Sequence, residues 1–353
     1  MTDRLLLVYA QDVGGAKFLA PTLPPLLRLR RTVVIAHPLA EAALREHRVP
    51  FRPLARELGG LPVGEDAWET WLRRRSVTHV YCTLSSPLRD RSNAHLVRAC
   101  VRAGVLSMGV MDHWKGLDRL LAADGSPDGV PDEILCIDEP SRRALRKLYG
   151  RRARVHVVGH PHLEGLRRLG RRPLNGRPPE IVVVSQPDTA DKGFRSVFDR
   201  KAAAALDAVL RESARSGDPS PRVFFRAHPK ETPSPRIERR VPADPAADWE
   251  RSLREHDVFV GLDSMLLVEA GLAGRGCVAL RLGGKCGPTD RTVPYRFAEE
   301  VGRLSELGPA LRRALRRARP ARPSCLVRVV RGSGVRVLSR LRSFLTKRPA
   351  RSG

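Results

Sequence analysis

One pair of side chains in this chain could move a proton. Asp112 and His113 stand side by side after the apolar run 106–111, so a carboxylate and an imidazole are both available as a general base. Adjacent residues on an extended chain point in opposite directions, so we expect only one of them to face a substrate, and we choose Asp112. An Asp that merely forms a turn before a helix is the alternative interpretation.

A second stretch could stabilise a phosphate leaving group. His228 follows a predicted strand at 222–227, with Arg226 two residues before it and Lys230 two residues after it. One imidazole and two cations at one point would suit the negative charge that develops on a phosphate during group transfer. The alternative is a surface loop that is basic because the whole chain is basic.

A third stretch, residues 257–282, predicts a strand, a turn, a helix over 265–273 and a second strand. Asp263 and Ser264 have the chemistry of an N-cap, so unpaired N–H groups and the positive end of the helix dipole would face an anion. Glu269 is the one charge in that helix, and a sugar hydroxyl could be its partner. An ordinary cap, with Glu269 reaching solvent or an Arg, is the alternative.

Other polar residues follow expected strands in the same way. Gly14 and Gly15 follow the first apolar run, which favours a phosphate-binding turn, although the spacing GxGxxG is absent. In GHPHLE, His160 and Glu164 are four residues apart and would share one face of a helix. They could orient an acceptor or act as a cap at a hinge. The candidates that complete this set are Ser185 and Gln186, at the end of a further strand.

The elements that would position these residues alternate between strands and helices. Such alternation predicts an α/β protein with doubly wound parallel sheets, in which ligands bind beyond the carboxyl ends of the strands. A segment without hydrophobic periodicity, GRRPLNGRPP, interrupts the alternation. We therefore predict two Rossmann-like domains facing each other across a cleft, with the boundaries 1–169, a linker at 170–179, 180–320, and a basic tail at 321–353.

Composition indicates which binding partners and which cellular compartment to expect. Among 353 residues, 64 Lys and Arg against 38 Asp and Glu give a net charge of +26, which suggests phosphorylated or other anionic partners. Arg, Ala, Gly and Pro are abundant throughout, so part of that charge is compositional. The six cysteines are scattered, which argues against a zinc site or a disulfide scaffold and favours reduced thiols. With no signal sequence or membrane span in the pattern, we expect a cytoplasmic protein.

The basic tail has two interpretations. From Gly302 onward, Leu and Val recur at roughly helical spacing among arginines (Leu311, Leu315; Val335, Leu338, Leu341, Leu345). One interpretation is an amphipathic helix that contacts anionic lipid at the inner face of the membrane. The other is that only the first part, with Leu311 and Leu315, packs back on the sheet and that the end is a solvated, frayed tail. We prefer it because the apolar face is small and is broken by Gly332 and Gly334. GxSxG, Walker and HExxH motifs are absent, which argues against hydrolase, P-loop and zincin functions.

Several of these motifs together resemble a known superfamily. Gly14-Gly15, GHPHLE, VVVSQP, HPKE and GLDSMLLVEAGLAGRG are similar to the GT-B glycosyltransferases. The resemblance covers residues 5–282. Within the superfamily it is nearest to bacterial polysaccharide-biosynthesis transferases, including sialyltransferase-like and glycerophosphotransferase-like branches, and to the related UDP-N-acetylglucosamine 2-epimerases.

The resemblance implies roles for individual residues. His228 and Pro229 would contact a donor nucleotide, Asp263 and Ser264 its phosphate, and Glu269 its ribose. The acidic D/E-D/E-G motif of the sialyltransferase-like branch is absent. Asp112-His113-Trp114 stands in a comparable place without matching it.

We therefore predict a metal-independent glycosyltransferase of polysaccharide or glycoconjugate biosynthesis. It would need no cofactor besides its nucleotide-sugar donor, and its acceptor, a glycan or a lipid-linked glycan, would enter near Gly14, Gly15 and Asp112. We expect no specific nucleic-acid partner. A nucleotide-sugar 2-epimerase on the same fold is one alternative. A non-catalytic basic protein that holds an anionic polymer is another, and its binding would weaken steeply with salt.

Overall fold

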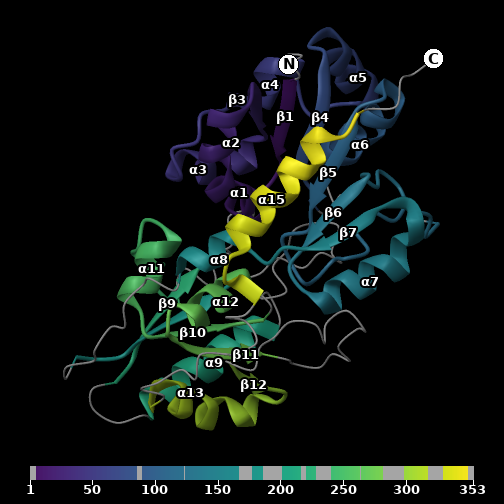
Figure 1. Cartoon of the computed structure of the whole chain (residues 1–353). Coiled ribbons are helices and arrows are strands. Elements are labelled where there is room, and N and C mark those ends of the chain that lie inside the picture. The colour runs from purple at the N-terminus through teal and green to yellow at the C-terminus, as the bar shows by residue number, and fades with distance from the viewer. Residues whose placement is uncertain are drawn as a thin grey trace. The chain divides into compact units, whose positions relative to one another are not determined.

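The structure is a computed structural model, and it describes residues 5–85, 90–122, 124–166, 177–185, 201–215, 220–227, 240–262, 264–280, 298–316 and 329–348. The described residues divide into two compact units (Figure 1). Unit 1 contains residues 5–164 and 329–348, and unit 2 contains the described residues between 165 and 316. Most of the predicted linker lies outside the described residues. Its last part, at Arg177, binds Asp257 of unit 2 through two hydrogen bonds of 2.7 and 2.6 Å.

The described part of unit 1 is built on a seven-stranded parallel sheet in the order β3-β2-β1-β4-β5-β6-β7. Central strands buried on both faces are continuous apolar runs, which is why their positions could be predicted from sequence. Strand β1 is buried along its whole length. The strands are β1 (Leu5–Ala10), β2 (Thr32–Ala36), β3 (Arg52–Pro53), β4 (Val77–Thr83), β5 (Leu106–Val110), β6 (Glu133–Cys136) and β7 (Arg154–Val157).

Helices cover both faces of this sheet. Alternate residues of β1 point to opposite faces, and because both sets are apolar, each face must be covered. Leu7 and Tyr9 pack in a core with Trp68 of α5, whereas Leu6 and Val8 pack in a second core with Phe18 of α1. The helices of the unit are α1 (Val13–Leu19), α2 (Leu23–Leu29), α3 (Pro38–Glu46), α4 (Leu54–Leu58), α5 (Glu65–Arg74), α6 (Ser92–Ala103), α7 (Glu139–Tyr149), α8 (Pro161–Leu166) and α15 (Ser333–Thr346), with 3-10 turns at Ala20–Thr22 and Gly150–Arg152.

Helix α15, yellow in Figure 1, belongs to unit 1 and not to a separate tail. Its residues Val337, Leu341 and Phe344 are buried in the second core of the sheet. Of the predicted apolar stripe, Leu341 lies in this core and Leu345 packs against it, whereas Val335 is 73% exposed. The preferred interpretation is confirmed for the first part of the tail, since Leu311 of helix α13 (Leu307–Arg316) is buried in the core of the other sheet. It is wrong for residues 333–346, which form a packed helix and not a frayed end.

The start of α15 is fastened to the end of the first 166 residues. The Glu164 carboxylate accepts hydrogen bonds from the backbone N–H groups of Gly332 and Gly334, at 2.6 and 3.2 Å. Arg336 donates in turn to the carbonyl oxygen of Val158, at 3.0 Å. A carboxylate at a helix N-terminus satisfies orphan donors and interacts favourably with the helix dipole.

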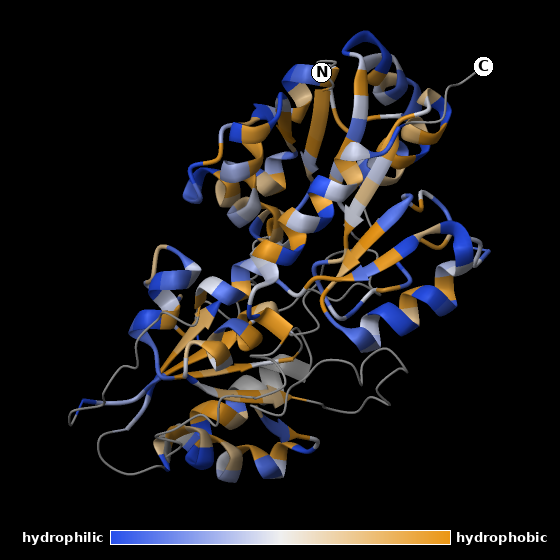
Figure 2. Cartoon of the chain, viewed as in Figure 1, coloured by the Kyte–Doolittle hydropathy of each residue, from blue (hydrophilic) through white to orange (hydrophobic). Residues whose placement is uncertain are grey.

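The described part of unit 2 forms a five-stranded parallel sheet in the order β12-β11-β10-β8-β9. In Figure 2 the strands of both sheets are largely hydrophobic, whereas the helices carry hydrophilic stripes. The strands are β8 (Glu180–Val184), β9 (Arg222–Arg226), β10 (Val258–Gly261), β11 (Gly276–Leu280) and β12 (Glu299–Val301). The helices are α9 (Lys201–Ala214), α11 (Trp249–Glu255), α12 (Met265–Leu272) and α13 (Leu307–Arg316), with a 3-10 turn at Leu304–Glu306.

The predicted fold class is confirmed: the chain is an α/β protein with two doubly wound parallel sheets. In the described ranges, none of the helices combines the length and the apolar character that a membrane span requires.

Candidate active site

The carboxyl edge of the unit 1 sheet gathers residues from three neighbouring strands. Strands β1, β4 and β5 are adjacent and parallel, so the segments that follow them meet at one edge. Helix α1 begins there, and Asp12 is its N-cap, accepting a hydrogen bond of 2.8 Å from the Gly15 backbone N–H. Thr83 ends β4, and Asp112 follows β5 by two residues.

Gly14 and Gly15 are needed because other groups approach their backbone closely. A Cβ atom on Gly14 would lie 2.4 Å from Asp112 Oδ2 and 3.8 Å from Asp12 Oδ1. A Cβ atom on Gly15 would lie 2.4 Å from Thr83 Cγ2. The structure therefore brings together the two predicted glycines and the predicted base.

Asp112 has the electrostatic environment of a general base. It is only 7% exposed, and Arg119 Nη1 donates to its Oδ1 at 3.2 Å. Burial, the largest cause, and the nearby Asp12 carboxylate both raise the pKa of Asp112, Arg119 opposes them, and the result is a pKa of about 6. A carboxylate with a pKa near neutrality can both accept a proton from a hydroxyl and be ionised at the start of the reaction.

Arg119 is held rigidly against this carboxylate. Its guanidinium also donates to the carbonyl oxygens of Leu84, Gly116 and Lys115, at 2.6, 2.7 and 2.8 Å. Sequence reasoning missed Arg119, which lies in a loop seven residues after Asp112 without any periodic signal. It also passed over Asp12, whose position just before Gly14 at the start of a helix was an N-cap signal.

His113 and Trp114 do local structural work beside Asp112. The Nδ1 atom of His113 accepts a hydrogen bond of 2.9 Å from the Lys115 backbone N–H. Trp114 is fully buried and donates from Nε1 to Asp138 Oδ2, at 2.7 Å. Asp138 is in turn the N-cap of α7, so this contact ties the loop to that helix.

His160 and Glu164 contact other helices of unit 1. His160 is 1% exposed, and its ring lies edge-on against Phe18 of α1, with 4.9 Å between ring centroids. Glu164 caps α15, as described above. These contacts match the cap interpretation of the GHPHLE motif, and an acceptor-binding role for the two residues stays a prediction.

The carboxyl edge of the unit 2 sheet carries an N-capped helix. The Ser264 hydroxyl accepts a hydrogen bond of 3.2 Å from the Leu266 backbone N–H, which confirms the predicted cap of α12. Glu269 is 2% exposed within that helix, and Ser185 is completely buried at the end of β8. The other predicted donor-binding residues, Gln186, His228, Lys230 and Asp263, lie outside the described residues.

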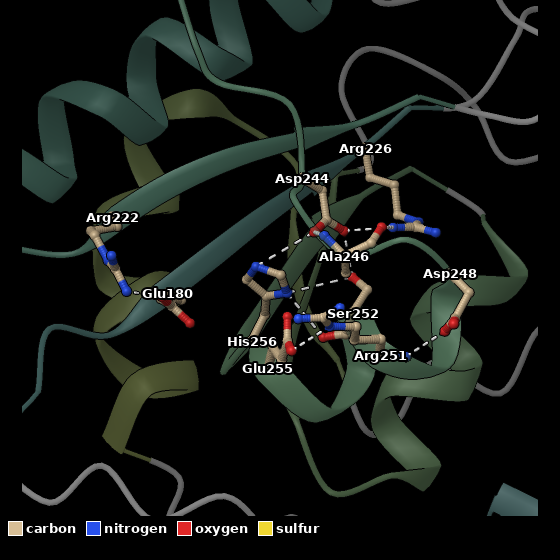
Figure 3. A network of polar contacts seen from close by, with 10 residues as sticks. All are labelled: Glu180, Arg222, Arg226, Asp244, Ala246, Asp248, Arg251, Ser252, Glu255 and His256. Carbon is tan, nitrogen blue, oxygen red and sulfur yellow. Dashed lines mark hydrogen bonds and ion pairs between the residues drawn. The ribbon is translucent and has the colours of Figure 1, made fainter.

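Arg226 ends β9 at the same edge of the unit 2 sheet (Figure 3). Its Nη1 donates to Asp244 Oδ2 at 2.7 Å and to the Ala246 carbonyl oxygen at 3.2 Å. The Arg226 side chain is 19% exposed, and its Nε and Nη2 make no hydrogen bond to a described residue. Because β8 lies between β10 and β9, about 10 Å separates the strands that lead to Ser264 and Arg226.

A metal site has no support among the described residues. They contain no group of three or more His, Cys, Asp or Glu side chains placed to hold an ion. The described cysteines at 82, 100, 136 and 277 are free and buried, and burial raises the pKa of each thiol.

Solved structures resemble this chain over nearly its whole length, whereas no family model and no curated protein matches the sequence. S. aureus MnaA in complex with UDP superposes with a TM-score of 0.70 at 11% identity, covering 99% of this chain and 100% of that one. A putative UDP-N-acetylglucosamine 2-epimerase from Listeria monocytogenes gives 0.68 at 11% identity, with 97% of each chain covered. CalG4, the calicheamicin glycosyltransferase, gives 0.59 at 14% identity, covering 98% and 99%.

The chain has the GT-B fold. The resemblance that the sequence motifs indicated is thereby confirmed at the level of the fold. Proteins with the GT-B fold in this comparison include both glycosyltransferases and epimerases. The reaction therefore has to be argued from the residues of the site.

Proposed function

We propose that the chain is a glycosyltransferase that moves a sugar from a nucleotide-activated donor to an acceptor hydroxyl. The observation that carries this proposal is the environment of Asp112. A buried carboxylate with a pKa raised to about 6, oriented by Arg119 and placed against a glycine turn, is suited to taking a proton from a hydroxyl.

The bond changes in this reaction are simple. Asp112 removes the proton as the acceptor oxygen forms its bond to the anomeric carbon of the sugar. The bond between that carbon and the phosphate oxygen breaks, and the nucleotide leaves with the electron pair. Arg119 keeps Asp112 in place during the transfer, because its other donors are committed to three backbone carbonyl oxygens.

Unit 2 would receive the charge of the leaving group. The N-terminus of α12 at Ser264, together with Nε and Nη2 of Arg226, which have no hydrogen-bond partner among the described residues, can stabilise phosphate oxygens without a divalent ion. Gln186, His228, Lys230 and Asp263 would add to this site, with Glu269 toward the ribose. The acceptor would be a glycan or lipid-linked glycan handled at the inner face of the membrane.

The test is a two-step assay on the full chain. A thermal-shift screen with UDP-, GDP-, CDP- and CMP-linked sugars identifies the donor, because a ligand bound only by the native state raises Tm. Nucleotide release is then measured with and without glycan acceptors. Release that depends on an acceptor and is lost in Asp112→Asn supports the proposal, and release that is unchanged in this variant contradicts it.

A 2-epimerase is the second candidate, and the Asp12–Asp112 pair favours it. Two carboxylates flank Gly14, and the charge of Asp12 contributes to the raised pKa of Asp112. A pair of acids can remove a proton from a sugar carbon and return one. The epimerase predicts that a nucleotide sugar incubated in D₂O without acceptor gains deuterium at the epimerised carbon, whereas a transferase leaves it unlabelled.

A further inference from the structure

Asp244 is the centre of a buried polar network in unit 2 (Figure 3). Its side chain is 2% exposed, and it lies on a segment that pairs with β9 through hydrogen bonds between Phe225 and both Pro242 and Asp244. Asp244 Oδ2 accepts from Arg226 Nη1 at 2.7 Å and from the Ser252 hydroxyl at 2.6 Å. Asp244 Oδ1 accepts from the Ala246 backbone N–H at 2.9 Å.

His256 closes the network from the end of α11. Its Nδ1 lies 3.0 Å from the Ser252 carbonyl oxygen, which only accepts, so this nitrogen carries a hydrogen. Its Nε2 lies 3.6 Å from Asp244 Oδ1, and the two form an ion pair only when both ring nitrogens carry a hydrogen. The direct hold on the Asp244 carboxylate therefore comes from the Ser252 hydroxyl of α11, with the His256 ring beside it.

The Arg226 nitrogen atoms that this network does not bind have a specific arrangement. Nη1 is occupied by Asp244 and by the Ala246 carbonyl oxygen. Nε and Nη2 stand along one edge of the planar guanidinium, and neither makes a hydrogen bond to a described residue. Two parallel N–H donors on one edge match two oxygens of a phosphate, a geometry that lysine cannot provide.

We propose that Asp244 is a positioning residue that fixes Arg226 as a two-donor fork for the phosphate of the nucleotide donor. The Ser252 hydroxyl holds Asp244 for this task, and the His256 ring packs beside the carboxylate. The inference rests on the proposed function for the identity of the ligand, but the anion site itself depends only on the geometry of the network. It assigns a role to three residues that the sequence motifs did not mark.

The direction in which Asp244→Asn changes phosphate affinity distinguishes a positioning role of Asp244 from a long-range charge effect. Removing the Asp244 carboxylate makes the surroundings of Arg226 more positive, so a long-range charge effect would make an anion bind more tightly. Without the Asp244 carboxylate, however, the Arg226 guanidinium is no longer held in the orientation that the phosphate needs. It must then lose rotamer freedom when it binds, which weakens binding. If Asp244 positions Arg226, Asp244→Asn weakens phosphate binding in spite of the gain in positive charge.

The experiment is calorimetry on the full chain with UDP and with inorganic pyrophosphate as probes. We expect Arg226→Lys and Asp244→Asn each to weaken binding of both probes about tenfold, while affinity for uridine, which has no phosphate, stays unchanged. The double variant should be no weaker than either single variant, because both remove the same contact. Glu180→Gln is the matched control: it removes a buried carboxylate paired with Arg222 at the other end of β9, and it should leave both affinities unchanged.

The outcomes distinguish this inference from the proposed function. Asp244→Asn that binds pyrophosphate as well as or better than the native chain overturns the positioning role. A second outcome is that both single variants lose pyrophosphate binding while the native chain releases no nucleotide from any sugar donor. This outcome supports the two-donor role of Arg226 and contradicts the proposed glycosyltransferase activity. If Asp244→Asn lowers Tm sharply, Ser252→Ala replaces it, because this variant removes only one hydrogen bond to Asp244 Oδ2. A two- to fourfold loss of affinity for pyrophosphate, with affinity for uridine unchanged, supports the positioning role if the loss disappears when Arg226→Lys is also present. Equal loss for uridine and UDP contradicts it.

Discussion

The two sheets present opposite chemistry at the same topological place. At the carboxyl edge of unit 1, Asp12 and Asp112 flank a glycine turn, and a single arginine holds the second of them. At the carboxyl edge of unit 2 stand the capped start of α12 and Arg226, whose Nε and Nη2 make no hydrogen bond to a described residue. Similar strand and helix patterns therefore carry acidic groups in one unit and hydrogen-bond donors in the other, which is the basis for proposing a proton acceptor and an anion site, and the difference comes from a few residues at strand ends.

We expect the largest effect from a substitution at the acidic site of unit 1. Asp112→Asn removes the base, and we expect kcat/KM to fall by about 10²- to 10⁴-fold while nucleotide affinity, measured by calorimetry, stays unchanged. In the native chain, activity should rise with pH through an apparent pKa near 6, because Asp112 must be ionised. A weakened nucleotide affinity in this variant would place Asp112 in the donor site instead.

The same substitution should stabilise the fold. Because the folded chain raises the pKa of Asp112, the folded state holds its proton more tightly, and stability falls as pH rises from about 4 to about 6. Asp112→Asn avoids this loss, so its unfolding free energy should exceed that of the native chain by on the order of 3 kcal/mol at pH 8. The gain should vanish near pH 4 in urea titrations, and an equal gain at both pH values would exclude the ionisation of Asp112 as its cause.

Gly14→Ala tests the close approach of helix α1 to the carboxylate. The new Cβ would lie 2.4 Å from Asp112 Oδ2, so one of the two must move, and overpacking of this kind typically costs about 1–3 kcal/mol. We expect a lower midpoint in urea and lower activity. Gly60→Ala is the matched control, because no atom lies within 4 Å of its Cβ position, and its effect should stay within about 0.5 kcal/mol.

The smallest expected effect concerns the helix end in unit 2. Ser264→Ala removes an N-cap and should cost about 1 kcal/mol of stability together with a few-fold loss in nucleotide affinity. Asp138→Ala removes the N-cap of α7 in unit 1, whose carboxylate accepts from the Ser141 backbone N–H at 2.9 Å. The control should lose at least as much stability and no affinity. Equal affinity losses in the two variants would show that the Ser264 helix has no special relation to the ligand.

The sequence predicts those parts of the fold that depend on local pattern. Strands such as β1 and β10 are buried on both faces, so they stand out as short apolar runs. The cap at Ser264 could be predicted because N-caps have a restricted chemistry and a fixed place before an apolar helix. Strand β12, with only three residues and two glutamates, gave no such signal.

The missing parts depend on contacts that no local pattern encodes. Arg119 and Asp244 bind their partners, Asp112 and Arg226, at sequence separations of seven and eighteen residues, and neither Arg119 nor Asp244 lies in a helix or strand whose period could predict the contact. Helix α15 had a visible apolar stripe, but a stripe shows only that a helix is covered on one side. It does not show what covers it, and here the cover is the sheet of unit 1.

The placement of α15 has a consequence for how the protein is made. Synthesis runs from the N-terminus, so the first 166 residues leave the ribosome long before Val337, Leu341 and Phe344 exist. Until then, one side of the first sheet lacks its last helix, and the Glu164 carboxylate lacks the N–H groups of Gly332 and Gly334. The first unit to be translated is thus the last to be finished, and a nascent chain stalled before residue 330 carries an uncovered apolar surface that a chaperone can bind.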